Sequence, residues 1–571
     1  MNLNKKLRYL IRILPQKEKI FFLVLAAVFL ISLAGIIKQA ASLVLADAPA
    51  DGGEISEGII GTPRFINPAL ATSDADRDLT ILIYSGLLRR DGQGNLIPDL
   101  AEDYKISEDG LSYAFKIRDE AVWHDNKPIT SDDVVFTIKT IQNSLIKSPK
   151  QASWEGVEIQ KISDKEISFS LKRPYAPFLE NAALGILPKH IWEKIPPEQF
   201  SLNVFNIKPV GSGPFKIKET KKDSSDITTA YILERNKKFT LGKPHLKKII
   251  LKFYPSEEAL IKAFKNKEID SLAAASPKNL SDLKRKNSIV KTLKLPWVFG
   301  VFFNQNQNPI LANQEVREAL DLASDKDMII QEVLGGFGER LASAIPPGVL
   351  GYFDFDFDLK NRPASETSAK EKLEKAGWKY NQEEKIYEKK NKKETLQLKF
   401  SLATSNAPDL AQAANMLKTN WEKIGVKTDV QIFEIGNLNQ NVIRPRKYDA
   451  LLFGLIVGGD PDPFAFWHSS QRNDPGLNIS LYANITVDRL LEEARTTLNP
   501  KARELKYQAF QKELIEDKPA IFLYSPTYIY LIPKSLKGME TENITVPSER
   551  FAQIHQWHVK TKKIWKRLPK G

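Results

Sequence analysis

The stretch Lys447–Ser470, KYDALLFGLIVGGDPDPFAFWHSS, decides the fold because it joins a short apolar run to an acidic and aromatic loop. Residues 448–457 are apolar and too few for a clear helix, so they predict a buried strand. Gly458 and Gly459 follow and end this strand. In an open α/β sheet, the loop at the carboxyl end of a strand is where ligands bind.

The loop itself carries the polar groups that such a site needs. Pro461 and Pro463 keep the chain out of a regular ladder, and Asp460 and Asp462 alternate with them. Two carboxylates therefore lie next to three aromatic residues, Phe464, Phe466 and Trp467. Aromatic rings at these positions suit contact with a ligand. An ordinary acidic surface turn is the alternative interpretation.

Length and composition limit the possible classes of protein. A chain of 571 residues exceeds the size at which a single core stops growing, so several domains are expected. The absence of cysteine excludes disulfides, thiolate metal sites, a cysteine nucleophile and a lipid-modified N-terminal cysteine. The net charge is +13, and basic residues gather at both ends of the chain. Such ends fit lipid headgroups or an anionic surface polymer better than nucleic acid.

An apolar run near the start of the chain is the reason to favour a membrane surface over nucleic acid. Ile20–Ile37 is 18 residues long, enough to cross a bilayer as a helix. By the positive-inside rule, residues 1–19 stay in the cytoplasm, and the chain that follows this membrane anchor lies outside the cytoplasm. Residues 38–57 are small, polar and turn-rich, which predicts a linker. A cleaved signal peptide is the alternative, because residues 46–50 (ADAPA) resemble small-residue cleavage sites.

Local patterns elsewhere predict alternating helices and strands. Leu79–Leu88 and Asp409–Gly425 have helical apolar spacing, and residues 426–433 resume as a strand. Ser131 is the expected N-cap of another helix. Pro500 opens a further helix, whose expected buried face carries Leu505, Ala509 and Leu514. This alternation predicts layered α/β sheets.

Several motifs occur in one order along residues 58–530. They are the Asn67-Pro68 entry, IYSGLLRRDGQGNLIPDLAEDY (83–104), WHDNKPITSDDVVFT (123–137), GSGPFKI (211–217), ERNKKF (234–239), FNQNQNP (303–309), VREAL (316–320), LEKAGW (373–378) and the opening stretch. In these motifs the chain resembles the family 5 extracellular solute-binding proteins, the dipeptide and oligopeptide receptors of ABC importers.

The resemblance implies a two-lobed, type II periplasmic-binding-protein-like α/β fold with an extra subdomain, preceded here by the transmembrane helix. The implied parts are lobe I (58–88, 209–296 and 525–571), a subdomain inserted in it (89–208) and lobe II (297–524). Two chain crossings, near residues 296–300 and 521–530, would join the lobes. The ligand would lie between them, where pockets commonly form.

Five residues are candidate ligand contacts. Trp297 and Trp467 would form apolar walls, while Asn304, Asp460 and Asp462 would supply directional acceptors. For Trp297, a place in the core of a lobe is an equal alternative.

The chain departs from the family at one position of this loop. Peptide-binding members place an aspartate three residues before its Asp-Pro, where it pairs with the free ammonium of the peptide. Val457 occupies that position here. A valine offers no charge, so the usual anchor is absent unless Asp460 replaces it. Longer or blocked peptides, oligosaccharides or another amphipathic solute are open alternatives.

The sequence favours a receptor over an enzyme. No HExxH pair, GxSxG elbow or phosphate-binding glycine loop occurs. We therefore expect no catalysis, no cofactor and no metal. The predicted function is a single-pass, membrane-anchored extracytoplasmic receptor that captures a peptide-like ligand and delivers it to the permease subunits of an ABC importer. The alternative is a surface sensor or chaperone-like interaction protein that uses the same two lobes without transport.

Overall fold

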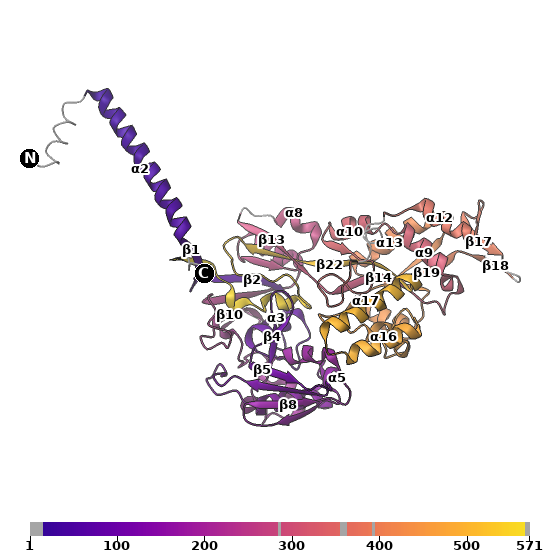
Figure 1. Ribbon diagram of the computed structural model, residues 1–571, viewed down its shortest axis with the longest axis horizontal. Helices are drawn as coiled ribbons and strands as arrows, with labels where there is room; N and C mark the ends of the chain where they lie inside the picture. Colours follow the sequence, from indigo (N-terminus) through magenta and orange to yellow (C-terminus); the bar gives the residue numbers. More distant parts are fainter. Residues whose placement is uncertain (1–14, 284–286, 355–362, 391–393, 566–571) are drawn as a thin grey trace, which may run out of the picture.

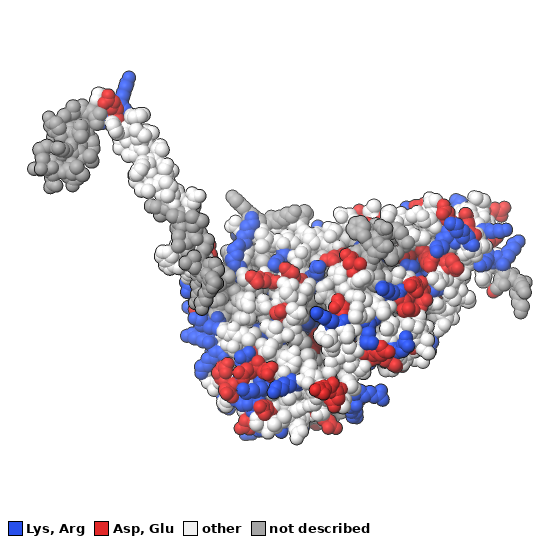
Figure 2. All heavy atoms as spheres, viewed as in Figure 1, with Lys and Arg blue, Asp and Glu red and all other residues white. Residues whose placement is uncertain are grey.

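The computed structural model describes residues 15–283, 287–354, 363–390 and 394–565. A long helix, α2 (Gln16–Val44), projects from one end of an elongated α/β body (Figure 1). From Ile20 to Ile36, α2 carries no Lys, Arg, Asp or Glu, whereas acidic and basic side chains are interspersed over the visible face of the body (Figure 2). The two regions therefore suit different surroundings.

One 12-stranded sheet runs through the body. In spatial order its path is β20 (Lys427–Phe433), β19 (Lys399–Ser405), β21 (Ala450–Ile456), β14 (Trp297–Phe303), β22 (Ala520–Pro533), β12 (Ser271–Ala273), β2 (Glu54–Ile60), β11 (Lys248–Tyr254), β10 (Thr228–Arg235) and β9 (Phe215–Lys222). Two further strands, β13 (Ser288–Lys294) and β15 (Gly338–Arg340), pair with β22.

Strand β22 links the two halves of this sheet. Its first residues, from Ala520 to Tyr524, pair with β14, and its later residues pair with β13 and β12. Strand β13 runs into β14 across residues 295–296. The chain thus passes between the halves at the two places where crossings were expected. The residue boundaries of the two lobes and of the inserted subdomain stay a prediction.

The inserted subdomain is built on a small antiparallel sheet. Its strands are, in spatial order, β5 (Ala101–Ile106), β6 (Ser112–Ile117), β8 (Glu166–Ser170) and β7 (Glu158–Lys161). Helix α4 (Ser131–Gln142) packs on it. Thr130, not Ser131, is the N-cap of α4, because Thr130 and Asp133 form a capping box. One continuous apolar core joins this subdomain to lobe I.

Helices cover the sheet and frame the site. They include α3 (Asp74–Ile83), α7 (Glu257–Lys265), α9 (Gln314–Ala323), α10 (Lys326–Leu334), α12 (Glu366–Lys375), α13 (Pro408–Lys423), α15 (Phe464–Trp467), α16 (Ile485–Thr496) and α17 (Pro500–Asp517). Strands β20 and β21 and helix α13 confirm the sequence prediction. Helix α3 begins before the predicted Leu79 and ends at Ile83, and Leu88 lies in strand β3 (Leu88–Arg90).

The buried face of α17 differs from the prediction. Leu514 is buried as predicted, but Leu505 is 66% exposed. Arg503, Tyr507 and Phe510 are also buried. The apolar spacing alone does not identify the buried face, because that face also carries the guanidinium of Arg503. That charge has a partner in the loop after β21, which local sequence does not show.

The prediction of an irregular linker over residues 38–57 is wrong. Helix α2 continues to Val44, and β1 (Leu45–Ala50) follows at once and pairs with β23 (Lys560–Trp565). Strand β2 then starts at Glu54. The physical reason is long-range pairing, since β1 finds its partner at the opposite end of the chain.

Candidate interlobe binding site

The loop after β21 has a backbone that few residues could adopt. Gly458 has φ +76° and Asp462 has φ +33°, both in the left-handed region. A Cβ added at Gly459 would lie 2.6 Å from Nη1 of Arg90, a residue of the inserted subdomain. The loop of lobe II therefore packs directly against the other lobe, and glycine at 459 lets the guanidinium come close.

Asp460 is held by two groups from α17. Its Oδ2 lies 2.8 Å from Nη2 of Arg503, and its Oδ1 accepts a hydrogen bond of 3.1 Å from the Tyr507 hydroxyl. The Asp460 and Arg503 side chains are only 10% and 8% exposed. Burial raises the pKa of Asp460, and Arg503 offsets part of that effect. The carboxylate is thus already paired within lobe II.

Asp462 bridges the two lobes. Arg495 of α16 donates to both of its oxygens, at 2.8 and 2.7 Å, a fork geometry that fixes the carboxylate. Tyr175 of the inserted subdomain donates its hydroxyl to Oδ2 at 3.0 Å. Burial raises the pKa of Tyr175, and Asp462 adds to the shift, so the phenol remains a neutral donor. This hydrogen bond is a direct polar contact between lobe II and lobe I.

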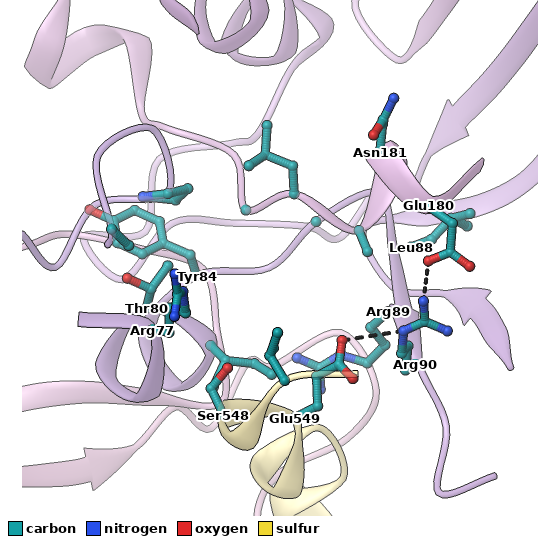
Figure 3. Close-up of a pocket in the computed structure, with 18 of the residues that line it drawn as sticks. Arg77, Thr80, Tyr84, Leu88, Arg89, Arg90, Glu180, Asn181, Ser548 and Glu549 are labelled. Atoms are coloured by element: carbon teal, nitrogen blue, oxygen red, sulfur yellow. Dashed lines mark hydrogen bonds and ion pairs between the residues drawn. The ribbon is translucent and has the colours of Figure 1, made fainter. Parts of the chain in front are cut away.

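Arg90 sits at the corner where the loop meets lobe I. It forms ion pairs with Glu180 and, at 3.2 Å, with Glu549 (Figure 3). One guanidinium thus faces two carboxylates. Burial raises the pKa of Glu180 to about 7 despite Arg90, and the Asp460 carboxylate adds to the shift. The corner therefore holds a carboxyl group that titrates near neutral pH.

Two cavities adjoin this corner, and Arg90 lines both. One of about 280 Å³ lies between lobe I and the inserted subdomain, and includes Tyr84 and Glu180 in its wall. The Tyr84 hydroxyl is buried and has no hydrogen-bond partner among the described residues (Figure 3). The other, of about 270 Å³, lies between the lobes, and is lined by Pro296, Leu350 and Gly459 among others. Both volumes lie near the lower end of ligand-site sizes.

The structure places the predicted contacts in different surroundings. Trp467 is 1% exposed and packs against Phe302 and Phe522 in the core of lobe II. Trp297 is the first residue of β14 and pairs with Ile456, next to the loop. Its buried Nε1 has no hydrogen-bond partner in the described part of the chain, so Trp297 keeps a free donor near the interlobe cavity.

Asn304 lies away from this group. Strands β14 and β21 are antiparallel, so Asn304 stands opposite the start of β21 whereas the loop follows its end. Asn304 directly follows β14 and is seven positions from Trp297, a span of roughly 23 Å. Its side chain donates to the Arg446 carbonyl and accepts from the amides of Asn306 and Gln307. Asn304 therefore shapes a turn in this structure.

Sequence reasoning missed the partners of the loop. Tyr175, Glu180, Arg90, Arg495 and Arg503 all contact it or flank it. The Asp-Pro-Asp-Pro pattern signals that cations are needed once the loop is buried. It does not say which of the many Lys and Arg residues supply them.

Comparison with known proteins identifies the family. The model of the bacterial extracellular solute-binding proteins, family 5, matches residues 95–476. The chain belongs to this family. Its members bind solutes and are not enzymes, in agreement with the sequence prediction. Family 5 relatives include the oligopeptide-binding protein AppA of Bacillus subtilis, 31% identical over 90% of this chain and 92% of that protein. The dipeptide-binding protein of Escherichia coli is 27% identical over 84% and 90% of the two chains.

Two solved structures agree with the fold. AppA of B. subtilis in complex with a nonapeptide has a TM-score of 0.67 and 30% identity, and the match covers 90% of this chain and 99% of AppA. NikZ of Campylobacter jejuni, in complex with Ni(L-His), also has a TM-score of 0.67, at 27% identity over 88% and 99% of the chains. The two-lobed α/β fold expected from the sequence is confirmed.

Proposed function

We propose that this chain is a membrane-tethered receptor that binds a peptide or a peptide-like solute between its lobes and delivers it to an ABC importer. Family membership supports binding of a solute, and the nonapeptide in AppA supports a peptide. Helix α2 contains a segment of 21 residues, Gln16–Ile36, that is long and apolar enough to cross a membrane. An uncleaved α2 would keep the receptor on the outer face of the membrane.

The observation that carries the proposal is the contact of the β21 loop with the inserted subdomain beside a cavity. Tyr175, Arg90 and Glu180 meet this loop from the other lobe. A ligand held there touches both lobes, so its binding energy favours closure. Native mass spectrometry of the purified full chain tests the proposal. We expect co-purified peptides, whereas a metal complex as in NikZ would contradict the peptide assignment.

We further propose Glu180 as the acceptor for a ligand ammonium. Val457 is 6% exposed in the lobe II core, and Asp460 is already neutralised by Arg503, so neither supplies the acceptor that the family pattern places in this loop. Glu180 shares Arg90 with Glu549, and Lys150 interacts with Glu549, so Glu180 is the less compensated of the two carboxylates at the edge of the cavities. An ammonium there would lower the pKa of Glu180 and keep it ionised.

Replacing Glu180 with glutamine keeps its shape and removes its charge. We expect peptides with a free N-terminus to bind about tenfold more weakly, the lower end for a hydrogen bond between charged groups. The same peptides with an acetylated N-terminus should bind both proteins equally. Calorimetry with matched peptide pairs measures this. An equal loss for both kinds of peptide would show that Glu180 serves Arg90 and not the ligand.

Replacing Tyr175 with phenylalanine removes the hydrogen bond to Asp462 between the lobes. We expect at least about tenfold weaker ligand binding, because the closed state loses one hydrogen bond to a charged group while the fold is unchanged. Faster ligand release in stopped-flow measurements should account for the loss. Tyr380→Phe, on an exposed tyrosine of lobe II, is the matched control. Unchanged release from Tyr175→Phe would refute a role in closure.

A further inference from the structure

The ribbon of β1 and β23 lies at the base of α2. All six residues of β1 pair with β23, from Leu45 opposite Trp565 to Ala50 opposite Lys560. No residue separates the end of α2 at Val44 from the start of β1. The described C-terminal strand is therefore fixed where the helix leaves the body (Figure 1).

Strand β23 is exposed along its whole length and carries an unusual mixture of side chains. Its sequence is KTKKIW, with lysines at 560, 562 and 563. Trp565 is 74% exposed and Ile564 is 43% exposed, and both lie at the end nearest α2. Lys563 forms an ion pair of 2.9 Å with Asp47 of β1. Because side chains alternate along a strand, each face of the ribbon has an apolar residue near the helix and at least one lysine beyond it.

The geometry puts the helix end of this ribbon a few ångströms outside the headgroup layer when α2 spans a bilayer. The segment Gln16–Ile36 covers about 31 Å as a helix, the thickness of the hydrocarbon core. The remaining helix, from Ile37 to Val44, adds about 12 Å, while the headgroup layer takes up roughly 5–8 Å on each side. Trp565 opposite Leu45 then lies within a few ångströms of the headgroups. Lys562 and Lys563 follow within about 10 Å, close to one Debye length.

We propose that the β1–β23 ribbon binds the anionic phospholipid surface of the membrane that holds α2. The proposal rests on the membrane tether put forward above. Lysines attract anionic headgroups, and tryptophan prefers the boundary between headgroups and acyl chains. The contact would fix the angle of the body on the membrane, which a single helix alone does not do.

The marginal stability of a two-stranded ribbon supports the proposal that a partner surface covers it. A two-stranded sheet with both faces in water is weakly stable by itself. None of the six β23 residues is buried against the body. A second contact that buries Trp565 and satisfies the lysines would stabilise the ribbon. An anionic bilayer is the partner that lies at the required distance from α2.

A single spin label can test this contact because the chain has no cysteine. The full chain with Thr561→Cys is labelled with a nitroxide and placed in nanodiscs of phosphatidylcholine, with or without one third phosphatidylglycerol. We expect the anionic lipid to immobilise the label and protect it from a water-soluble nickel relaxant. Leu202→Cys, 85% exposed in the inserted subdomain, should respond to neither lipid.

Reversing the charges of the β23 lysines is the second part of the test. Lys560→Glu, Lys562→Glu and Lys563→Glu together should free the label, since each lysine near such a surface contributes about fivefold in binding. The matched triple Lys375→Glu, Lys423→Glu and Lys427→Glu in lobe II should leave it docked. An equally mobile label in both lipids, or equal release by both triples, would overturn the proposal.

Intact mass separates this failure from failure of the tether. A chain recovered with α2 but with a free label keeps the tether and loses only the lipid contact. A chain recovered without residues 1–44 refutes both.

Discussion

Replacing Arg550 with methionine is expected to lower the free energy of unfolding by about 3–5 kcal/mol, because it leaves two buried carboxylates without their cation. Arg550 is 1% exposed in lobe I and donates to both Glu57 and Asp78 at 2.6–2.9 Å. Tyr530 also donates to Glu57. Denaturant unfolding of the variant and of Arg489→Met, a 70% exposed arginine, measures the difference. The control should change stability by less than about 0.5 kcal/mol.

The pH dependence identifies the cause of that loss. Burial already raises the pKa of Asp78 to about 6 in the presence of Arg550. Without Arg550, the folded-state pKa of Asp78 rises further above its unfolded value, because Arg550 is the cation that lowers it. A carboxyl group of this kind destabilises the fold when it is ionised, so the deficit should be largest above pH 7 and shrink toward pH 5. A deficit that is the same at both pH values would refute the electrostatic account.

Replacing Arg503 with methionine should cost about 3 kcal/mol and weaken ligand binding at least tenfold. The change strands the Asp460 carboxylate, which is 10% exposed, and releases the loop that meets lobe I. Denaturant unfolding and calorimetry with the co-purified peptide measure the two effects. Lys512→Met, at an exposed site on the same helix, is the control.

A double variant shows whether the unpaired charge is responsible. Adding Asp460→Asn to Arg503→Met removes the stranded carboxylate and should recover at least about 1 kcal/mol of the lost stability. If the double variant is no more stable than Arg503→Met, then lost packing of the arginine stem explains the effect and the ion pair does not hold the loop.

The sequence predicted those elements whose signal is local. The apolar run at 448–457 became β21, and the helical spacing at 409–425 became α13, because both patterns match a single period and have clear stops. Strand β1 was missed because its only partner is β23. Nothing in residues 45–50 indicates a strand until that pairing is known.

The sequence predicted the place of the β21 loop in the fold but not the partners of its carboxylates. The loop after β21 does lie against the other lobe, as the position of a loop at the end of a buried strand suggests. Asp460 and Asp462 are predicted from the sequence to be directional acceptors for a ligand, and in the structure each has an arginine partner from α16 or α17. Burial of a loop requires such partners, and their identity depends on helix packing that residue spacing does not encode.

Closure of the lobes on a peptide is the central claim, and a distance between two labels tests it most directly. Ile162→Cys in the inserted subdomain and Leu505→Cys on α17 are both exposed, and the chain has no other cysteine. Pulsed electron resonance on this doubly labelled chain, with and without a randomised nonapeptide library, gives the distance distribution. We predict that peptide collapses a broad distribution into one short distance. An unchanged distribution, with peptide binding shown by native mass spectrometry of the same sample, would contradict the account.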